Sequence, residues 1–286
     1  MHHGRNPTRR NRNIGTAKQG LGQDNRLVIP WPWHQLEPHW ATLGQAVRLD
    51  KAVQGHTLTL YIEAVTAGFV HACSVDDVLT VLAHVPPRHL TALDMVIWRQ
   101  PTRKQAILQP VWGRFIYHAE IKRDTGTAII LEAAQPHKAI RWKRTLGPEG
   151  QKELARLRAD GHVVREDKRH FAVVPSVDSI RATQLYRTLP HELGHLVDWH
   201  TQVTWPAGDD DARWRTLDAR YPQKPPVERE QAAHRYADAL SREWMARGIC
   251  PFTRRLDHDA LQQDGLDSAW FGQASTGVKG DSQAGG

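Results

Sequence analysis

The segment from His191 to His200, HELGHLVDWH, constrains the fold of this 286-residue chain more than any other. It is typical of a helix in which His191 and His195 are one turn apart and face the same direction. The leucines of the segment lie on the opposite face, which predicts a buried side. Gly194 costs about 1 kcal/mol of helix stability relative to Ala. We therefore expect a packing reason for it, such as a close neighbouring strand.

The pattern H-E-x-x-H within this segment is that of helical zinc sites in metallopeptidases. His191 and His195 can bind one Zn²⁺ from the same side. Glu192, one step around the helix, then lies beside the metal, where it can act as the general base for a zinc-bound water. The alternative is two surface histidines on an ordinary helix, because the motif fixes only three positions.

A catalytic zinc site needs a third protein ligand and one open position. His200 is about half a turn out of phase with His191 and points away from it. The metzincin spacing is excluded, because Asp198 and Thr201 stand where it requires Gly and His. We interpret Asp198 as an acceptor that orients a ligand histidine; the alternative is a solvated aspartate near the helix end.

A second helix, beginning at Pro225 and Pro226, offers the better candidate for the third ligand. Its inward stripe recurs at helical spacing and comprises Ala233, Tyr236, Ala237, Leu240 and Trp244. Glu230 extends this stripe by one turn, whereas Glu228 is about 200° away on the helical wheel. The alanines leave room for the two helices to approach, so Glu230 can reach the metal. The alternative is that both glutamates only favour the helix dipole.

Together these two helices resemble a known family. H-E-L-G-H followed by E-x-x-A-x-x-Y-A resembles the gluzincin zinc peptidases, and the later part is most similar to lethal-factor-like peptidases and to small mobile-element peptidases that cleave phage repressors. The resemblance implies a Zn²⁺ cofactor and a protein or peptide substrate. The residues that it covers as metal ligands and general base are His191, His195, Glu230 and Glu192. Residues 1–55 and 137–176 have no counterpart in it.

The resemblance also implies a Tyr or His side chain that stabilises the oxyanion. Tyr221, His234 and Tyr236 are all candidates for this role, and none matches the family position. The implied fold class is α+β and zincin-like: a small mixed or antiparallel sheet with an edge strand above a two-helix zinc site. We expect residues 26–272 to form this domain, with 137–176 as an insertion and with 1–25 and 273–286 as disordered tails.

Hydrophobic periodicity and turn residues predict the remaining elements. We expect a short helix at 38–53, strands at 56–64 and 94–99, and a helix capped by Ser74 between them. A strand, or two short ones, covers 107–121, and a turn at 124–126 leads to a strand at 128–133. Residues 151–159 are expected to be helical, followed by a hairpin at 162–174. From 177 onward one bent helix or two lead into the motif, with a kink at Pro190.

Composition limits the other functions that this chain can have. The net charge is +7, but residues 1–25 hold five Arg and Lys against one Asp, which leaves only +3 elsewhere. This basic tail suggests an alternative function, a non-enzymatic zincin-fold module that contacts nucleic acid. Cys73 and Cys250 fit no disulfide framework. No signal peptide or membrane span is recognised, so the default expectation is a cytoplasmic protein without membrane contact, and export without a signal stays an alternative.

Overall fold

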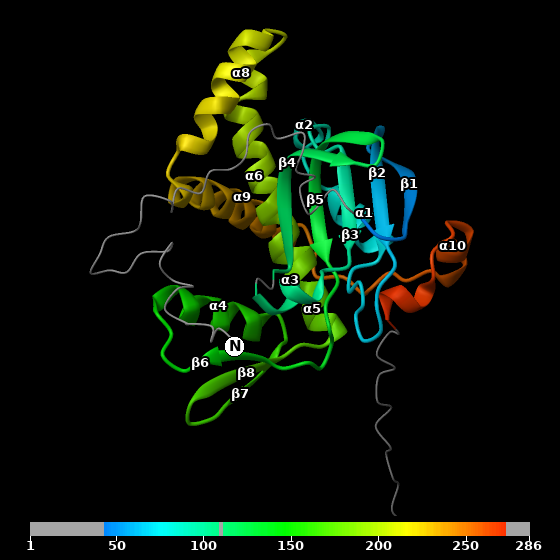
Figure 1. Ribbon diagram of the computed structural model, residues 1–286, viewed down its shortest axis with the longest axis vertical. Coiled ribbons are helices and arrows are strands. Elements are labelled where there is room, and N and C mark those ends of the chain that lie inside the picture. The colour runs from blue at the N-terminus through cyan, green and yellow to red at the C-terminus, as the bar shows by residue number, and fades with distance from the viewer. Residues whose placement is uncertain (1–42, 109–110, 273–286) are drawn as a thin grey trace, which may run out of the picture. The chain divides into compact units, whose positions relative to one another are not determined.

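Two hairpins and one strand between them make up the main sheet. The computed structural model describes residues 43–108 and 111–272 (Figure 1). The sheet has five strands in the order β1-β2-β3-β5-β4. Their bounds are β1 Ala46–Val53, β2 His56–Glu63, β3 Met95–Arg99, β4 Gly113–Ile121 and β5 Asp124–Glu132. The β1–β2 and β4–β5 pairs are antiparallel, and β3 is parallel to β2 and β5. The chain is thus mixed α/β with a mixed sheet, and β4 is an edge strand.

The helix expected at 38–53 is wrong over residues 46–53, which form β1. Val47 and Leu49 pack against the core, while Arg48, between them, pairs with Asp124 at 2.7 Å. This alternation is the period of a strand, and Gln54 and Gly55, both at positive φ, supply the turn to β2. The predictions for residues 1–25, 26–42 and 273–286 concern residues outside those that the structure describes.

The strand expected from 107 begins only at Gly113, because α3 (Arg103–Leu108) precedes it. The pairing of β4 with β5 shifts between Ile116 and Ala119, so β4 is a single bulged strand. The expected strands at 56–64, 94–99 and 128–133 are confirmed. The Ser74 capping box is also confirmed, and α1 (Val75–Leu82) begins directly after it.

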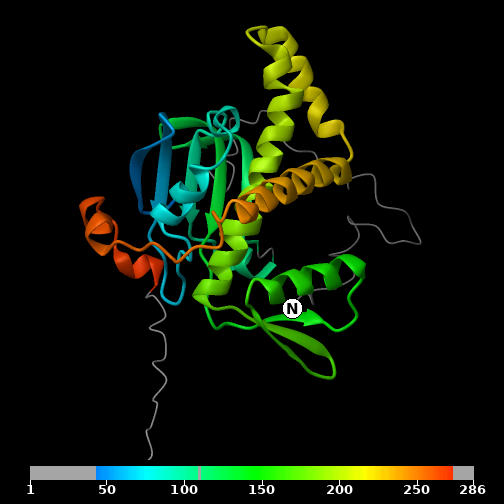
Figure 2. The ribbon, with the colours of Figure 1, turned by 180° about the vertical axis from the view of Figure 1, so that it is seen from behind.

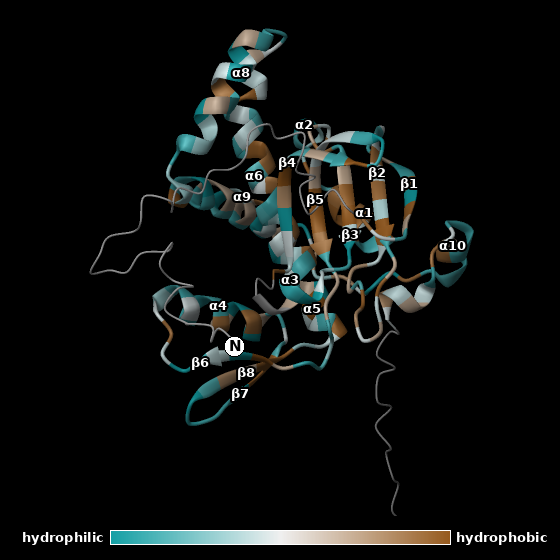
Figure 3. Cartoon of the chain, in the orientation of Figure 1, coloured by the Kyte–Doolittle hydropathy of each residue, from teal (hydrophilic) through white to brown (hydrophobic). Residues whose placement is uncertain are grey.

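Helices cover one face of this sheet and form the main core with it. Buried residues of β2, β3 and β5 meet residues of α1, of α6 (Leu189–Gln202) and of α9 (Pro226–Ala246). The short helix α2 (Pro87–Leu90) follows α1, and Figure 3 shows hydrophobic residues concentrated along the central strands. No helix within residues 43–108 and 111–272 has the length and apolarity needed to cross a membrane.

The helix that carries the motif is continuous from residue 177. It comprises α5 (Val177–Thr183), the π-helical turn η4 (Gln184–Thr188) and α6. Pro190 stands in the first turn of α6, directly after the π-turn. Since Pro cannot donate a backbone hydrogen bond, a change in helical geometry at this point is expected. The structure therefore answers the question of one helix or two: one helix, interrupted by a π-turn.

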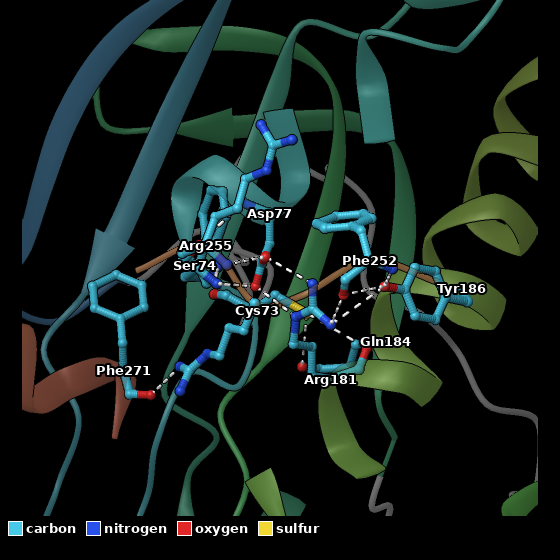
Figure 4. A network of polar contacts seen from close by, with 11 residues as sticks. Cys73, Ser74, Asp77, Arg181, Gln184, Tyr186, Phe252, Arg255 and Phe271 are labelled. Carbon is cyan, nitrogen blue, oxygen red and sulfur yellow. Dashed lines mark hydrogen bonds and ion pairs between the residues drawn. The ribbon is translucent and has the colours of Figure 1, made fainter. Parts of the chain in front are cut away.

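A buried ion pair fixes the start of this helix (Figure 4). Arg181 of α5 binds both carboxylate oxygens of Asp77 of α1, with both N–O distances at 2.8 Å. Arg181 also donates to the carbonyl oxygen of Phe252, and Tyr186 donates to the same oxygen. The backbone amide of Arg255 donates to Asp77. The segment after α9 is thereby held against both helices.

Residues 137–176 form a unit with its own small core. A three-stranded antiparallel sheet, β6-β8-β7, packs with α4 (Pro148–Ala159) around Leu154, Leu157 and Val173. The strands are β6 Ile140–Lys143, β7 Val163–Glu166 and β8 His170–Val174. The expected helix and hairpin are confirmed, and β6 is an addition. Arg187 of η4 ties this unit to the motif helix through Glu153 at 3.0 Å and Asp160 at 2.6 Å.

Between α6 and α9 the chain forms a second pair of helices. α7 (Thr204–Ala207) and α8 (Asp211–Arg220) are followed by the 3₁₀ turn η5 (Tyr221–Gln223). Asp210 caps α8 by accepting from the backbone amide of Arg213. After α9 come α10 (His258–Gln263) and η6 (Ser268–Phe271).

Candidate metal centre

His191 and His195 face the same point from successive turns of α6. Their Nε2 atoms are 3.1 Å apart, and the two rings are nearly perpendicular at 87°. Burial lowers the pKa of His191 to about 3 and also lowers the pKa of His195. Both imidazoles are therefore neutral at pH 7, which is the form that binds metal ions.

Glu230 of α9 completes a group of three. Its Oε2 lies 3.3 Å from His191 Nε2, and its Oε1 lies 3.5 Å from His195 Nε2. Among the described residues, these three side chains are the one group of His, Cys, Asp or Glu that could hold a metal ion, with ligand atoms all within 4.8 Å of one another. Glu228, two residues earlier, is exposed and outside this group.

The donor set fits a tetrahedral metal ion. Ligand atoms about 2.05 Å from one tetrahedral Zn²⁺ are roughly 3.3 Å apart. The Nε2 atoms of His191 and His195, 3.1 Å apart, are close to this value, and Glu230 approaches them through different oxygens, Oε2 at 3.3 Å and Oε1 at 3.5 Å. Two imidazoles and one carboxylate also leave a fourth position open, as in hydrolytic sites.

A close crossing of α6 and α9 sets the position of Glu230 (Figures 1 and 2). A Cβ added at Gly194 would lie 2.7 Å from both the Cα and the carbonyl oxygen of Ala233. Only glycine fits there, so the expected packing reason for Gly194 is present. The neighbour is a helix, however, and the expectation of a strand is wrong. Glu230 precedes Ala233 by three residues and is carried to the histidines by this contact.

Glu192 is buried beside the three ligand candidates, with 8 % of its surface exposed. Burial raises its pKa to about 8, and a hydrogen bond from the backbone amide of Phe115 opposes this shift. Phe115 belongs to β4, so the edge strand contacts the carboxylate directly. Arg114 also lowers this pKa through its charge.

A pocket of about 290 Å³ contains the group and is bounded by the edge strand. Its walls come from β4, α6 and α9, and no residue of β1, β2 or β3 contributes. The lining residues are Gly113, Arg114, Phe115, Tyr117, His191, Glu192, His195, Pro226, Arg229 and Glu230. Side chains that could hold a metal ion and a backbone edge that can pair with another strand thus share one cleft.

The expectation that Asp198 accepts a hydrogen bond from a ligand histidine and so orients it is wrong. Its carboxylate accepts hydrogen bonds from Tyr221 at 2.7 Å and from Gln202 at 2.5 Å. The Nδ1 atoms of His191 and His195 are buried and have no partner among the described residues. Asp198 therefore orients Tyr221 rather than a histidine, although its charge raises the pKa of His195.

The three candidates for an oxyanion donor lie in different places. The hydroxyl of Tyr236 is 2.9 Å from His89 Nδ1, and that of Tyr221 is bound by Asp198. Neither tyrosine lines the pocket. The ring of His234 lies 4.6 Å from that of His191, centroid to centroid, one turn beyond Glu230. Of the three, His234 alone is next to the metal-ligand group.

Sequence reasoning missed the donors that β4 and α9 place in the pocket. Tyr117 and Arg229 line it, and the ring of Tyr117 packs edge-on against that of Tyr221, with centroids 5.7 Å apart. Burial raises the pKa of Tyr117, which keeps its hydroxyl protonated. Arg229 directly precedes Glu230 in the sequence, and this was the one signal available for it.

His200 is buried against Trp199 and Trp205 and is not part of the group, in keeping with its helical phase.

Comparisons with models of protein families, with curated proteins and with solved structures find no match to this chain.

Proposed function

We propose that this protein is a zinc-dependent metallopeptidase of the gluzincin type, with a zincin-like fold. The observation that carries the proposal is the convergence of His191, His195 and Glu230 from two helices beside the buried carboxylate of Glu192. A purely structural metal site has no use for a second, non-ligating carboxylate. The pocket along β4 supplies room for a substrate chain.

Each residue has a distinct task in this proposal. His191, His195 and Glu230 hold Zn²⁺, which when bound supplies a Lewis acid that polarises the peptide carbonyl and lowers the pKa of water. The charge of a bound Zn²⁺ would favour the ionised form of Glu192, which accepts a proton from the water that attacks the carbonyl carbon. Glu192 then gives the proton to the nitrogen of the bond that breaks. The products are one carboxylic acid and one amine.

In this proposal the edge strand β4 binds the substrate by pairing with it as an additional strand. Among the described residues, β4 pairs with β5 on one side only, so its other edge, apart from the Phe115 amide that donates to Glu192, can pair with a second chain. An extended peptide added there gains main-chain hydrogen bonds regardless of its sequence. Its carbonyl groups would then pass over the three ligand residues, which line the same pocket.

Two measurements on the purified full chain test the proposal. We expect close to one zinc per chain, lost in His191→Ala. Glu192→Gln should retain the zinc and abolish cleavage of unfolded protein substrates, because the amide cannot accept the proton. The matched control is Glu243→Gln, an exposed glutamate on α9. Absence of bound zinc, or undiminished cleavage by Glu192→Gln, would contradict the proposal.

A further inference from the structure

A second cavity, of about 480 Å³, adjoins the metal centre at the start of β4. Arg114 lines both cavities. Trp112 lines the second cavity, and Gly113, the next residue, lines the first. Since a strand advances about 3.3 Å per residue, the two cavities are neighbours along the edge strand. The size lies within the roughly 300–1,000 Å³ of ligand sites.

The far wall of this cavity is built by the 137–176 unit. Ile140 and Trp142 of β6, Leu157 of α4 and Val173 of β8 line it. All four belong to the small core of that unit, and Trp112 packs on the same core. The near wall comes from α3 and from the end of β5, through Ala106 and Ala133 among others. The exposed lining is mainly apolar and aromatic.

The charged residues of the cavity exclude a cationic occupant. Glu132 is 4 % exposed, and its Oε1 already accepts from Arg114 at 2.9 Å and from Arg99 at 3.4 Å. Lys138 and Arg141 also line the cavity. Positive charge is therefore in excess, and the one carboxylate is neutralised. A lysine or arginine side chain would meet net repulsion there.

The position of β4 relative to this cavity is firmly set. Gln184 of η4 donates from one amide nitrogen to the carbonyl oxygens of Trp112 and Glu132, each at 2.8 Å. Both strands of the β4–β5 hairpin are thus attached, at its open end, to the helix that carries His191. A chain lying along β4 meets the cavity and the metal centre at a fixed spacing.

We infer that this cavity is a specificity pocket for a large apolar side chain, aliphatic or aromatic, of the substrate. That side chain belongs to a residue on one side of the cleaved bond, within one or two positions of it. The inference rests on the proposed peptidase function and adds its substrate class. The 137–176 unit thereby acquires a role, the selection of the residue beside the cleavage site.

The test begins with a random peptide library cleaved by the wild-type full chain, with the cut sites read by mass spectrometry. We expect Phe, Leu, Met or Trp at one fixed position beside the cut, and depletion of Lys and Arg there. In a matched pair of peptides, Ala at this position should lower kcat/KM at least roughly tenfold relative to Phe. Cuts with no preference for large apolar residues at any position would overturn the inference and leave the peptidase function intact.

Two variants fill the cavity from opposite walls. Ala106→Trp of α3 and Ala139→Trp before β6 should each lower kcat/KM for the Phe peptide about tenfold. Neither should change the value for the Ala peptide or the zinc content. Ala246→Trp, at the exposed end of α9, is the control. Equal loss for both peptides, or unchanged selectivity in both filled variants, contradicts the inference. Failure of the wild type to cut any peptide contradicts the proposed function itself.

Discussion

Gly194 and Ala233 are in backbone contact where α6 crosses α9, so close that a Cβ on Gly194 would lie 2.7 Å from Ala233 Cα. This contact holds Glu230 at the histidines. Gly194→Ala should therefore weaken zinc binding, because α9 must move away. We expect a loss of about 1–3 kcal/mol of unfolding free energy from overpacking, despite the better helix propensity of Ala. Chelator competition and urea unfolding measure the two effects. Gly147→Ala, at a position with open space, is the control.

The two glutamates at the start of α9 are predicted to behave differently. Glu230→Gln removes the anionic ligand and should reduce zinc affinity by at least tenfold, because the amide is a poorer donor. Glu228→Gln should leave affinity unchanged, since Glu228 is exposed and outside the group. Metal analysis after dialysis against a chelator gives the comparison. Equal affinity of the two variants would remove Glu230 from the ligand set.

Tyr117 is predicted to stabilise the charge that develops on the carbonyl oxygen. Its hydroxyl group lies in the pocket wall beside Arg229. Tyr117→Phe should lower kcat on the order of 10²-fold, with zinc content unchanged. Tyr236→Phe is the matched control, because the Tyr236 hydroxyl is bound to His89. Steady-state kinetics on one peptide measure kcat for both variants. Equal kcat values for Tyr117→Phe and Tyr236→Phe would show that another residue stabilises the oxyanion, with His234 as the next candidate.

The Asp77–Arg181 pair is predicted to be a main contributor to stability. Asp77 is fully buried and Arg181 nearly so, and removing one partner leaves a buried charge. Asp77→Asn should cost about 3–5 kcal/mol of unfolding free energy. Glu149→Gln, which breaks the exposed pair with Lys152, should lower the free energy of unfolding far less. Urea denaturation compares the two variants, and similar small losses would show that the network in Figure 4 is dispensable.

Acid should destabilise the protein through His71. Burial lowers the pKa of this histidine from 6.5 to about 4. The unfolded chain therefore binds a proton that the folded chain does not, between about pH 6.5 and pH 4. The stability that neutral His71 contributes is complete above pH 6.5 and falls as the pH drops, by up to about 1.4 kcal/mol per pH unit. His71→Gln should flatten this slope in urea titrations at several pH values, while His258→Gln, at an exposed position, should not.

Much of the two-helix arrangement could be predicted from the spacing of residues within each helix. Helical phase distinguished Glu230 from Glu228 and set His200 aside, because phase depends only on spacing along one element. The structure brings Glu230 to His191 and His195. The resemblance that linked these residues to zinc peptidases stays a proposal for this chain.

What sequence reasoning missed depends on partners distant in the chain. Residues 46–53 are a strand because β2 pairs with all of them, and an isolated reading of 38–53 as a helix ignored that partner. Asp198 binds Tyr221, 23 positions away. Tyr117 faces the pocket because of the register of an edge strand that contains a bulge, and no local periodicity specifies that register.

The side-chain amide of Gln184 fixes the position of β4 relative to the helix that carries His191. Gln184 holds the carbonyl oxygens of Trp112 and Glu132, so β4 cannot slide past the helix without breaking both hydrogen bonds. A slip by two residues would keep every side chain on its own face and still shift a paired peptide by about 7 Å. The π-turn that carries Gln184 therefore sets the register between the helix and the strand. For the proposed peptidase, a shift of Gln184 would change which peptide bond is cut before it changed the rate of cleavage.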